Sequence, residues 1–272
     1  MNAPDSATLD HPTAEPAAAA ECALSHQDEL RDQGYTIMRS AIGRRQLDEL
    51  RSAIDQRLSG TAIADHGDHL HETNLVAKES IFREVAQHPL VLATVEGLLG
   101  EDCILSSCNQ GTRKPECSAQ AMHRDMHIWG PSLPWMPIPI GIQVAWCVDD
   151  FTIQSGATML VPGSHLRADA RADEAPIAAV APAGSMILFD ARTYHAGGAN
   201  RSDRFRRAVL CFYVRSWLKP QSDHKRSIDP ALTADLSTTM ARLLGFQRQS
   251  PVEREDGTSQ ILPAPGATGF YG

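Results

Sequence analysis

Short β-like runs separated by glycine- and proline-containing turns fill most of the chain after Cys103. Runs of this kind predict an antiparallel sandwich or barrel, because each strand must bury one face against a second layer. Seven strands are expected: Ile104–Asn109, Ala119–His127, Ile140–Val148, Thr158–Val161, Ile177–Val180, Ser185–Asp190 and Arg207–Val214.

Helical patterns come before and after these runs. Helices are expected at Ser25–Gly34, Gly43–Leu58, Pro89–Leu99 and Pro230–Phe246, and Tyr35–Met38 is a candidate for one further strand. We therefore predict an α+β fold with a mainly β core, in which a jelly roll (a cupin-like double-stranded β-helix) is flanked by α-helices. The interior of such a barrel is wide enough for one metal ion and a small ligand.

A single domain is expected for this chain of 272 residues. Residues 1–24 are rich in Ala, Pro, Asp and Thr without a hydrophobic period, which predicts a disordered tail. The domain is expected to span residues 25–246, and the Pro- and Gly-rich residues 247–272 to form a C-terminal tail.

The net charge argues against two classes of partner. A formal charge of −8 and a pI of about 5.7 disfavour nucleic acids and anionic membranes, both of which bind basic surfaces. No run approaches the roughly 18 apolar residues of a membrane span. Asp5 and Asp10 stand where a secretory signal needs basic residues followed by an apolar core. We expect a cytoplasmic protein, monomeric or homodimeric, that binds a small molecule.

The six cysteines lack the paired C-x-x-C spacing of a zinc site. A chain of this size without a secretory signal does not need disulfides, so all six are predicted to be reduced thiols with the role of small apolar side chains. They are Cys22, Cys103, Cys108, Cys117, Cys147 and Cys211.

An H-x-D motif, His123-Arg124-Asp125, lies within one of the expected strands. Residues two apart on a strand point to the same face, so this imidazole and carboxylate would be presented together. They make two thirds of the facial site that non-heme Fe(II) oxygenases use, which leaves the opposite positions on the ion open. His26-Gln27-Asp28 and His66-Gly67-Asp68 have the same pattern. The first lies in an expected helix and the second in a polar loop, where two side chains are not forced onto one face.

A third ligand is needed, and four histidines are candidates: His127, His165, His195 and His224. His127 would follow in line on the same strand and close a facial triangle poorly. His165 stands at a turn and His224 in a polar loop, where structural roles are expected. His195 is favoured because small residues follow it and would keep an ion accessible, and a β-like run with arginines at its entrance comes next.

These motifs together resemble the phytanoyl-CoA dioxygenase (PhyH-like) family of Fe(II)/2-oxoglutarate oxygenases. That family shows H-x-D, then a P-G-S-H turn, then H-x-x-G-x-N-x(5)-R. The matching residues here are His123, Asp125, Pro162 to His165, His195, Gly198, Asn200 and Arg206. The resemblance runs from about residue 25 to 246. It implies that His123, Asp125 and His195 bind Fe(II), and that 2-oxoglutarate and O2 are co-substrates.

The resemblance also implies where 2-oxoglutarate binds. Arg206 would hold its distal carboxylate, since a planar guanidinium can donate two parallel hydrogen bonds to it. Arg204 would share a strand face with Arg206 and is the serious rival; Arg207 is another alternative. Gln120 matches a glutamine that could donate to a carboxylate of 2-oxoglutarate.

Two further positions bear on the cosubstrate. Trp146 matches an aromatic residue that lies beside it in some relatives, although a core position is equally consistent with its apolar neighbours. Many relatives carry Ser or Thr where this chain has Gly197, so the hydrogen bond of that hydroxyl must be absent or supplied elsewhere.

The expected reaction is hydroxylation of an unactivated C–H bond, with release of succinate and CO2. Asp125 disfavours halogenation, since halogenases of this superfamily replace that carboxylate; desaturation, epoxidation and ring closure remain open.

Two regions are candidate substrate contacts. One is the apolar loop Trp129–Pro137. The other is the polar stretch Gly60–Asn74, with His69, His71 and Asn74. A natural-product intermediate is favoured over a CoA thioester, because no basic phosphate-binding patch is found. The alternative is a non-oxidative, metal-binding cupin-like isomerase or ligand-binding module.

Overall fold

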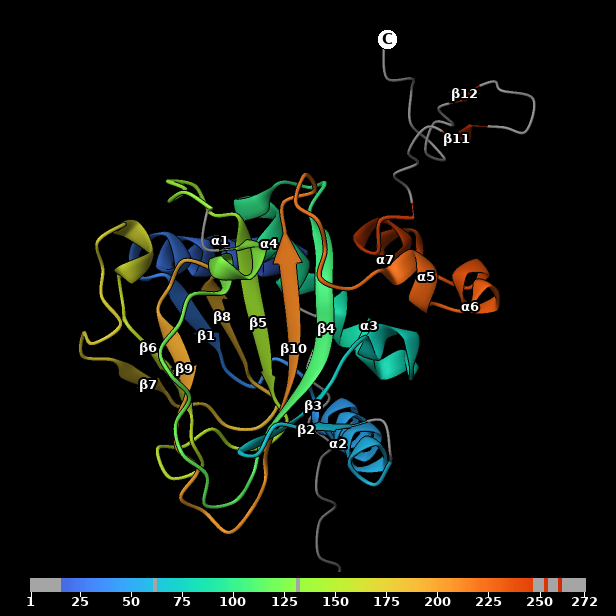
Figure 1. The fold of residues 1–272 in the computed structure, drawn as a ribbon. Coiled ribbons are helices and arrows are strands. Elements are labelled where there is room, and N and C mark those ends of the chain that lie inside the picture. The colour runs from blue at the N-terminus through green and yellow to red at the C-terminus, as the bar shows by residue number, and fades with distance from the viewer. Residues whose placement is uncertain (1–15, 61–62, 131–132, 247–251, 254–258, 261–272) are drawn as a thin grey trace, which may run out of the picture.

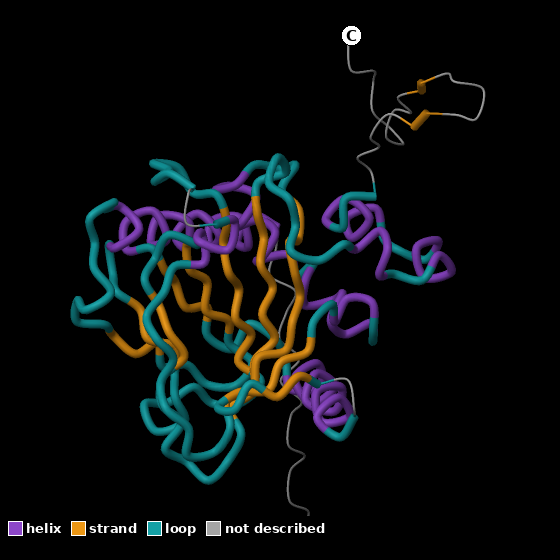
Figure 2. Tube along the Cα trace, in the orientation of Figure 1, coloured by secondary structure: helices purple, strands orange, loops and turns teal. Residues whose placement is uncertain are grey.

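Two antiparallel sheets form the centre of the molecule, a computed structural model that describes residues 16–60, 63–130, 133–246, 252–253 and 259–260 (Figures 1 and 2). The larger sheet has the order β1-β8-β5-β10-β4-β3-β2. Its strands are β1 (Tyr35–Met38), β2 (Ala64–Asp65), β3 (His69–Glu72), β4 (Ile104–Arg113), β5 (Gly141–Cys147), β8 (Met186–Asp190) and β10 (Arg206–Val214). The smaller sheet has the order β7-β6-β9, with β6 (Thr158–Leu160), β7 (Ile177–Ala179) and β9 (His195–Gly197).

The face of the large sheet that looks toward the small sheet is apolar over part of its area. Ala145, Ile187 and Phe189 from the large sheet form one buried cluster with Leu160 and Ala179 from the small sheet. Two facing antiparallel sheets with a core between them, flanked by helices, confirm the jelly-roll prediction. Alternation along each strand sends the intervening side chains to the opposite face.

Helices cover that opposite face, as Figure 1 shows for α1 and α4 behind the sheet. The helices are α1 (Pro16–Gln33), α2 (Arg44–Leu58), α3 (Ser80–Ala86), α4 (Pro89–Leu99), α5 (His224–Ser227), α6 (Pro230–Ala234) and α7 (Thr238–Leu243). Leu50 and Ile54 of α2 pack into the largest buried cluster with Trp146 of β5 and Tyr213 of β10. Burial of this face is the main source of stability for the fold.

Several predicted elements differ from those observed. The expected strand Ala119–His127 is reduced to one bridge at His123, followed by a 3-10 helix, η2 (Asp125–Trp129). The polar stretch Gly60–Asn74 contains the hairpin β2–β3, which completes the sheet beside β4. The helix expected at Pro230–Phe246 is divided, since Ser237 caps a new helix by accepting a hydrogen bond from the backbone N–H of Met240.

The ends of the chain also differ from the predictions. Helix α1 begins at Pro16, so residues 16–24 are helical rather than a disordered tail; residues 1–15 lie outside the described residues. In the expected C-terminal tail, only the two-residue strands β11 (Val252–Glu253) and β12 (Ser259–Gln260) are described.

Two further predictions concern the described residues. None of the described helices is long and apolar enough to cross a membrane. All six cysteines are free thiols, as predicted. Cys108 and Cys211 lie side by side on β4 and β10 with their sulfur atoms 3.6 Å apart, well beyond bonding distance.

Candidate metal centre

A backbone bridge places His123 opposite His195. Each of the two residues donates its backbone N–H to the carbonyl oxygen of the other, with both N···O distances 2.9 Å. Side chains at directly opposed positions of an antiparallel pair point to the same face. The two imidazole rings therefore meet, with their centroids 4.3 Å apart. This pair of hydrogen bonds, together with the one from the Gln120 backbone N–H to the Gly197 carbonyl oxygen, holds two segments that are far apart in sequence side by side.

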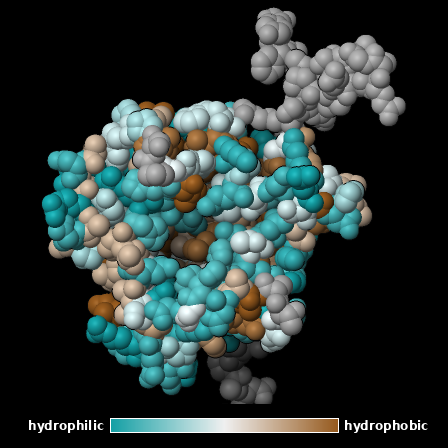
Figure 3. Space-filling model, in the orientation of Figure 1, coloured by the Kyte–Doolittle hydropathy of each residue, from teal (hydrophilic) through white to brown (hydrophobic). Residues whose placement is uncertain are grey.

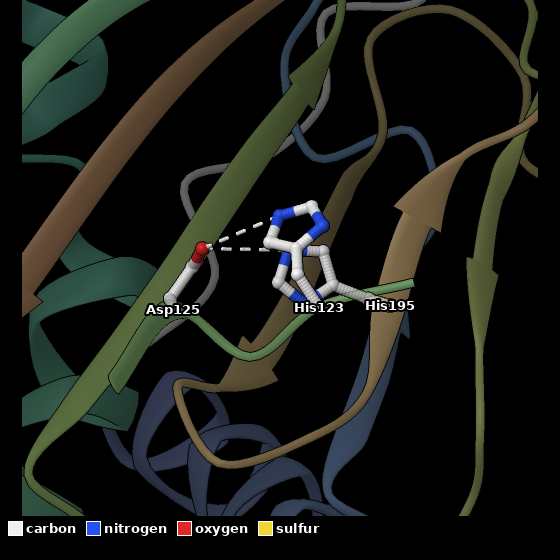
Figure 4. Close-up of side chains that lie close together, drawn as sticks. All are labelled: His123, Asp125 and His195. Atoms are coloured by element: carbon white, nitrogen blue, oxygen red, sulfur yellow. Dashed lines mark ion pairs between the residues drawn. The ribbon is translucent and has the colours of Figure 1, made fainter. Parts of the chain in front are cut away.

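Asp125 joins the two histidines by a different route from the one predicted. It is the first residue of η2 rather than a strand residue, so the turn of the chain after Arg124 brings its carboxylate back toward His123. Its Oδ1 lies 3.7 Å from His123 Nε2 and 3.5 Å from His195 Nε2. Figure 4 shows the carboxylate facing both rings. The three donor atoms all lie within 4.8 Å of one another, which is compatible with one shared metal ion.

Backbone contacts orient both imidazoles. His123 Nδ1 lies 2.9 Å from the carbonyl oxygen of Ala121, and His195 Nδ1 lies 3.1 Å from that of Thr193. A carbonyl oxygen can only accept, so each Nδ1 carries the hydrogen and each Nε2 is left with its lone pair toward Asp125. Burial lowers the pKa of His195, which keeps the imidazole neutral and able to bind a metal.

A pocket of about 240 Å3 opens beside these three side chains. Figure 3 shows a hollow near the centre of this face of the molecule, with hydrophobic residues (brown) visible inside it. Ala145, Phe189 and Leu210 supply apolar lining from the large sheet. Asp125 is the only acidic side chain among the described residues that line this central pocket.

Arg206 lines the central pocket and is almost fully buried. Its guanidinium lies over the ring of Phe151, 4.3 Å from the centroid, and its Nε has no hydrogen-bond partner among the described residues. Burial, and secondarily the neighbouring Arg113, lower its pKa to about 10, so it stays cationic at neutral pH. A buried cation without a carboxylate partner is costly, and an anionic ligand would remove that cost.

The rival arginines lie elsewhere. Arg204 is exposed and does not line the central pocket, and Arg207 binds Asp149 and Asp55 through its guanidinium. Of Arg204, Arg206 and Arg207, Arg206 is therefore the one that is available to a ligand of this pocket.

Gln120 and Gly197 form one unit at the edge of the pocket. The backbone N–H of Gly197 donates to Gln120 Oε1 at 2.9 Å, which leaves the Gln120 amide nitrogen to donate toward a ligand. A Cβ at position 197 would lie 2.7 Å from the same oxygen. The Gln120 side chain therefore occupies the space that a Ser or Thr at 197 would need.

The structure does not bring Trp146 to the site. Trp146 is fully buried in the cluster beneath the helices, beside His88, and it is absent from the lining of the central pocket. Its neighbour Ala145 faces the pocket instead, because successive residues of β5 point to opposite faces. The assignment of Trp146 to cosubstrate binding is wrong, and the core position is the observed one.

A match to known proteins agrees with this geometry. The family model described as phytanoyl-CoA dioxygenase (PhyH) matches residues 30–208. The chain belongs to the phytanoyl-CoA dioxygenase family. The iron, 2-oxoglutarate and O2 expected from the sequence are the cofactor and co-substrates of this family, and the His123, Asp125 and His195 donors fit such an iron.

Curated relatives of this PhyH-family chain include two fungal dioxygenases. It is 26% identical over 197 residues to dioxygenase af480 of Aspergillus fumigatus, a match that covers 70% of this chain and 63% of that protein. It is 27% identical over 257 residues to dioxygenase trt7 of Aspergillus terreus, which covers 87% of this chain and 86% of that protein.

Two solved structures share the fold. The epimerase SnoN, in complex with Fe3+, alpha ketoglutarate and nogalamycin RO, superposes with a TM-score of 0.63 at 19% identity, over 74% of this chain and 85% of that one. The alpha ketoglutarate dependent carbocyclase SnoK from nogalamycin biosynthesis gives a TM-score of 0.60 at 18% identity, over 78% and 90% of the two chains.

The other candidate ligands of this PhyH-family chain lie away from the metal centre. His127 is exposed on η2, His165 is buried with its Nε2 near the carbonyl oxygen of Arg31, and His224 is buried against Leu105. Within the described residues, neither of the two other H-x-D pairs belongs to a cluster of three metal donors.

The predicted substrate contacts are only partly brought to the pocket. His69 and His71 of β3 line it, whereas Asn74 contacts Asn109 and His224 outside it. The described part of the Trp129–Pro137 loop packs on another cluster, where the Trp129 ring lies 5.9 Å from that of Phe212.

Sequence reasoning missed several pocket residues. Arg113, Gln143, Thr158 and Phe189 line the pocket but were not selected. Gln143 lies two residues before Ala145 on β5 and therefore points to the same face, and Phe189 is its partner on β8. The alternation of side chains along these strands would have identified both residues. Arg113 lies beyond the predicted end of its strand at Asn109, in a polar stretch that carries no hydrophobic signal.

Proposed function

We propose that this chain is an Fe(II)/2-oxoglutarate-dependent oxygenase whose iron is held by His123, Asp125 and His195. The observation that carries the proposal is the meeting of these three donors in one pocket with buried Arg206, which has no acidic partner among the described residues. Two nitrogens and one carboxylate oxygen on one side of an ion leave its other positions open. When bound, iron with 2-oxoglutarate and O2 supplies the oxidising chemistry.

The chain's own residues position the reactants. In the proposed arrangement, Arg206 holds the distal carboxylate of 2-oxoglutarate through two hydrogen bonds, which are strong because the site is buried. Gln120 donates its amide N–H to a carboxylate of the same molecule. Phe189 and Leu210 keep water away from the reacting atoms.

We further propose that the substrate is a small organic molecule, a natural-product intermediate, and that one of its unactivated C–H bonds is hydroxylated. Retention of Asp125 argues against halogenation, because the carboxylate occupies the position that a chloride would need. Epimerisation and ring closure are the competing outcomes, since an epimerase and a carbocyclase share this fold. The cytoplasmic location and the monomeric or homodimeric state stay predictions.

Arg206 also separates this function from a non-oxidative cupin-like isomerase or binding module. Such a protein needs a metal site but does not require a buried guanidinium beside it. In the oxygenase, the distal carboxylate of 2-oxoglutarate is the partner that this buried cation lacks.

The test is anaerobic titration of the protein with Fe(II) and then 2-oxoglutarate, followed by exposure to air. An oxygenase is expected to show the visible charge-transfer band of a 2-oxo acid chelated to Fe(II), and then to release succinate. The Asp125→Ala variant should show neither signal, and Arg204→Leu should retain both. Equal succinate release by wild type and Asp125→Ala would refute the proposal.

A further inference from the structure

Two buried arginines face each other across neighbouring strands of the large sheet. Arg206 of β10 is the register partner of Arg113 of β4, and their exposed fractions are 6% and 3%. Directly opposed residues have Cβ atoms about 4.5–5.5 Å apart, and like charges at such positions are destabilising. Both side chains line the central pocket.

Neither arginine has an acidic partner among the described residues. The charge of Asp149 acts on Arg206, but the Asp149 carboxylate is already bound by the guanidinium of Arg207. Arg113 donates from Nη2 to the carbonyl oxygen of Ser118, but its Nε and Nη1 are buried without any hydrogen-bond partner. Asp125, the acid of the central pocket, faces the metal donors. The region around the pair therefore carries two positive charges that the protein leaves uncompensated.

The Arg113 side chain lies against Gly197, on the strand that carries His195. A Cβ at position 197 would lie 3.4 Å from Arg113 Cδ, an ordinary contact, and 2.7 Å from Gln120 Oε1. The arginine stem thus passes from the large sheet to β9, two residues beyond the metal donor. Arg113 and Gln120 together fill the space beside Gly197.

We propose that Arg113 and Arg206 form a clamp of two guanidinium groups for the distal carboxylate of 2-oxoglutarate. This inference rests on the proposed function and adds a second cationic group to it. A carboxylate has about four acceptor sites, enough for both arginines. Arg113 would present its partnerless Nε and Nη1 to the ligand. The clamp also supplies the hydrogen bonds that a hydroxyl at position 197 would otherwise make.

The clamp predicts effects of opposite sign on stability and on binding. Arg113→Leu removes a buried cation that has no acidic partner among the described residues, so the metal-free protein should unfold at a higher temperature than wild type. The same change should weaken 2-oxoglutarate binding by about tenfold to a hundredfold, as expected for loss of a charge-assisted hydrogen bond. A merely structural Arg113, bonded to Ser118, would instead leave a less stable protein with unchanged affinity.

The experiment uses full-length protein loaded with Mn(II), which binds 2-oxoglutarate without turnover. Calorimetric titration with 2-oxoglutarate compares wild type, Arg113→Leu, Arg113→Lys and the exposed control Arg204→Leu. Thermal unfolding of the metal-free proteins is measured with and without glutarate, which has the distal carboxylate but cannot chelate metal through a keto group.

The clamp expects wild-type affinity in Arg204→Leu, several-fold loss in Arg113→Lys and the largest loss in Arg113→Leu. It also expects glutarate to stabilise wild type more than either Arg113 variant. If Arg113→Leu does not fold, the Lys variant decides the question, because the ammonium keeps the charge without the fork. Wild-type affinity in the Arg113 variants overturns the clamp. Absence of 2-oxoglutarate binding in wild type would overturn the proposed function itself.

Discussion

The two faces of the large sheet differ in what their side chains do, although they alternate along the same strands. On β5 and β10, Trp146, Val209 and Tyr213 face the helices, are fully buried and belong to the largest apolar cluster. Gln143 and Arg206, on the same two strands, face the small sheet and line the central pocket. The first face contributes stability through apolar burial. The second holds two buried arginines without an acidic partner among the described residues, which is expected where an anionic ligand supplies the partner.

The largest effect is expected at the pocket face, from Asp125→Asn. The amide keeps the size of the carboxylate but loses its charge, so Fe(II) affinity should fall by at least about a hundredfold. The free energy of unfolding of the metal-free protein should change little, because Asp125 forms its ion pairs with the two histidines and with no other side chain among the described residues. Metal titration and thermal unfolding check the two parts. An unfolded variant would show that this residue also belongs to the stabilising face.

Trp146→Phe on the helix face is expected to lower stability and to leave ligand binding unchanged. The Trp146 Nε1 has no hydrogen-bond partner among the described residues, so only volume is lost, at a cost of about 1–2 kcal/mol in unfolding free energy. Denaturant unfolding measures this loss. The dissociation constant for 2-oxoglutarate should equal that of wild type, and a tenfold change would restore the sequence-based assignment of Trp146 to the cosubstrate site.

The helix face was largely predictable from the sequence, because apolar periodicity reports burial directly. Helix α4 was predicted with its observed bounds, and β1 likewise. The prediction failed where polar backbone contacts decide the structure. The strand expected at Ala119–His127 is a single bridge followed by a 3-10 turn, since its ends are fixed by distant residues such as Ala191, whose carbonyl accepts from Met126 N–H.

On the pocket face, only the residues that belong to sequence motifs could be predicted. The H-x-D motif and the residues around His195 pointed to three donors that the structure brings together, although Asp125 lies in η2 and not on a strand face shared with His123. Arg113 carries no motif and became visible only through its register with Arg206. Pairing across strands depends on the whole fold, so a single sequence does not reveal it.

A smaller effect on stability is expected from a change in pH, because buried His224, beside β4, can take up a proton. Its Nε2 lies 3.0 Å from the carbonyl oxygen of Leu105, and burial lowers its pKa. The unfolded chain, with a pKa of about 6.5, then binds the proton more readily, so stability is present above that pH and is lost as pH falls below it. The loss is at most about 1.4 kcal/mol per pH unit for one group. Thermal unfolding between pH 7.5 and 5.5 should be less pH-dependent in His224→Gln than in wild type.

The smallest effect is expected from Gly197→Ala on the pocket face, where it concerns the affinity for 2-oxoglutarate. The new Cβ would lie 2.7 Å from Gln120 Oε1, the end of an exposed and flexible side chain that can move aside. If Gln120 helps to hold 2-oxoglutarate, its displacement should weaken binding only about threefold to tenfold, the share of one neutral hydrogen bond. A double-mutant cycle with Gln120→Ala isolates the cause: Gly197→Ala should add nothing once that amide is absent. Additive losses in the double variant would mean that Gly197 acts through Arg113 instead, whose Cδ is the first atom outside Gln120 that the Cβ would meet.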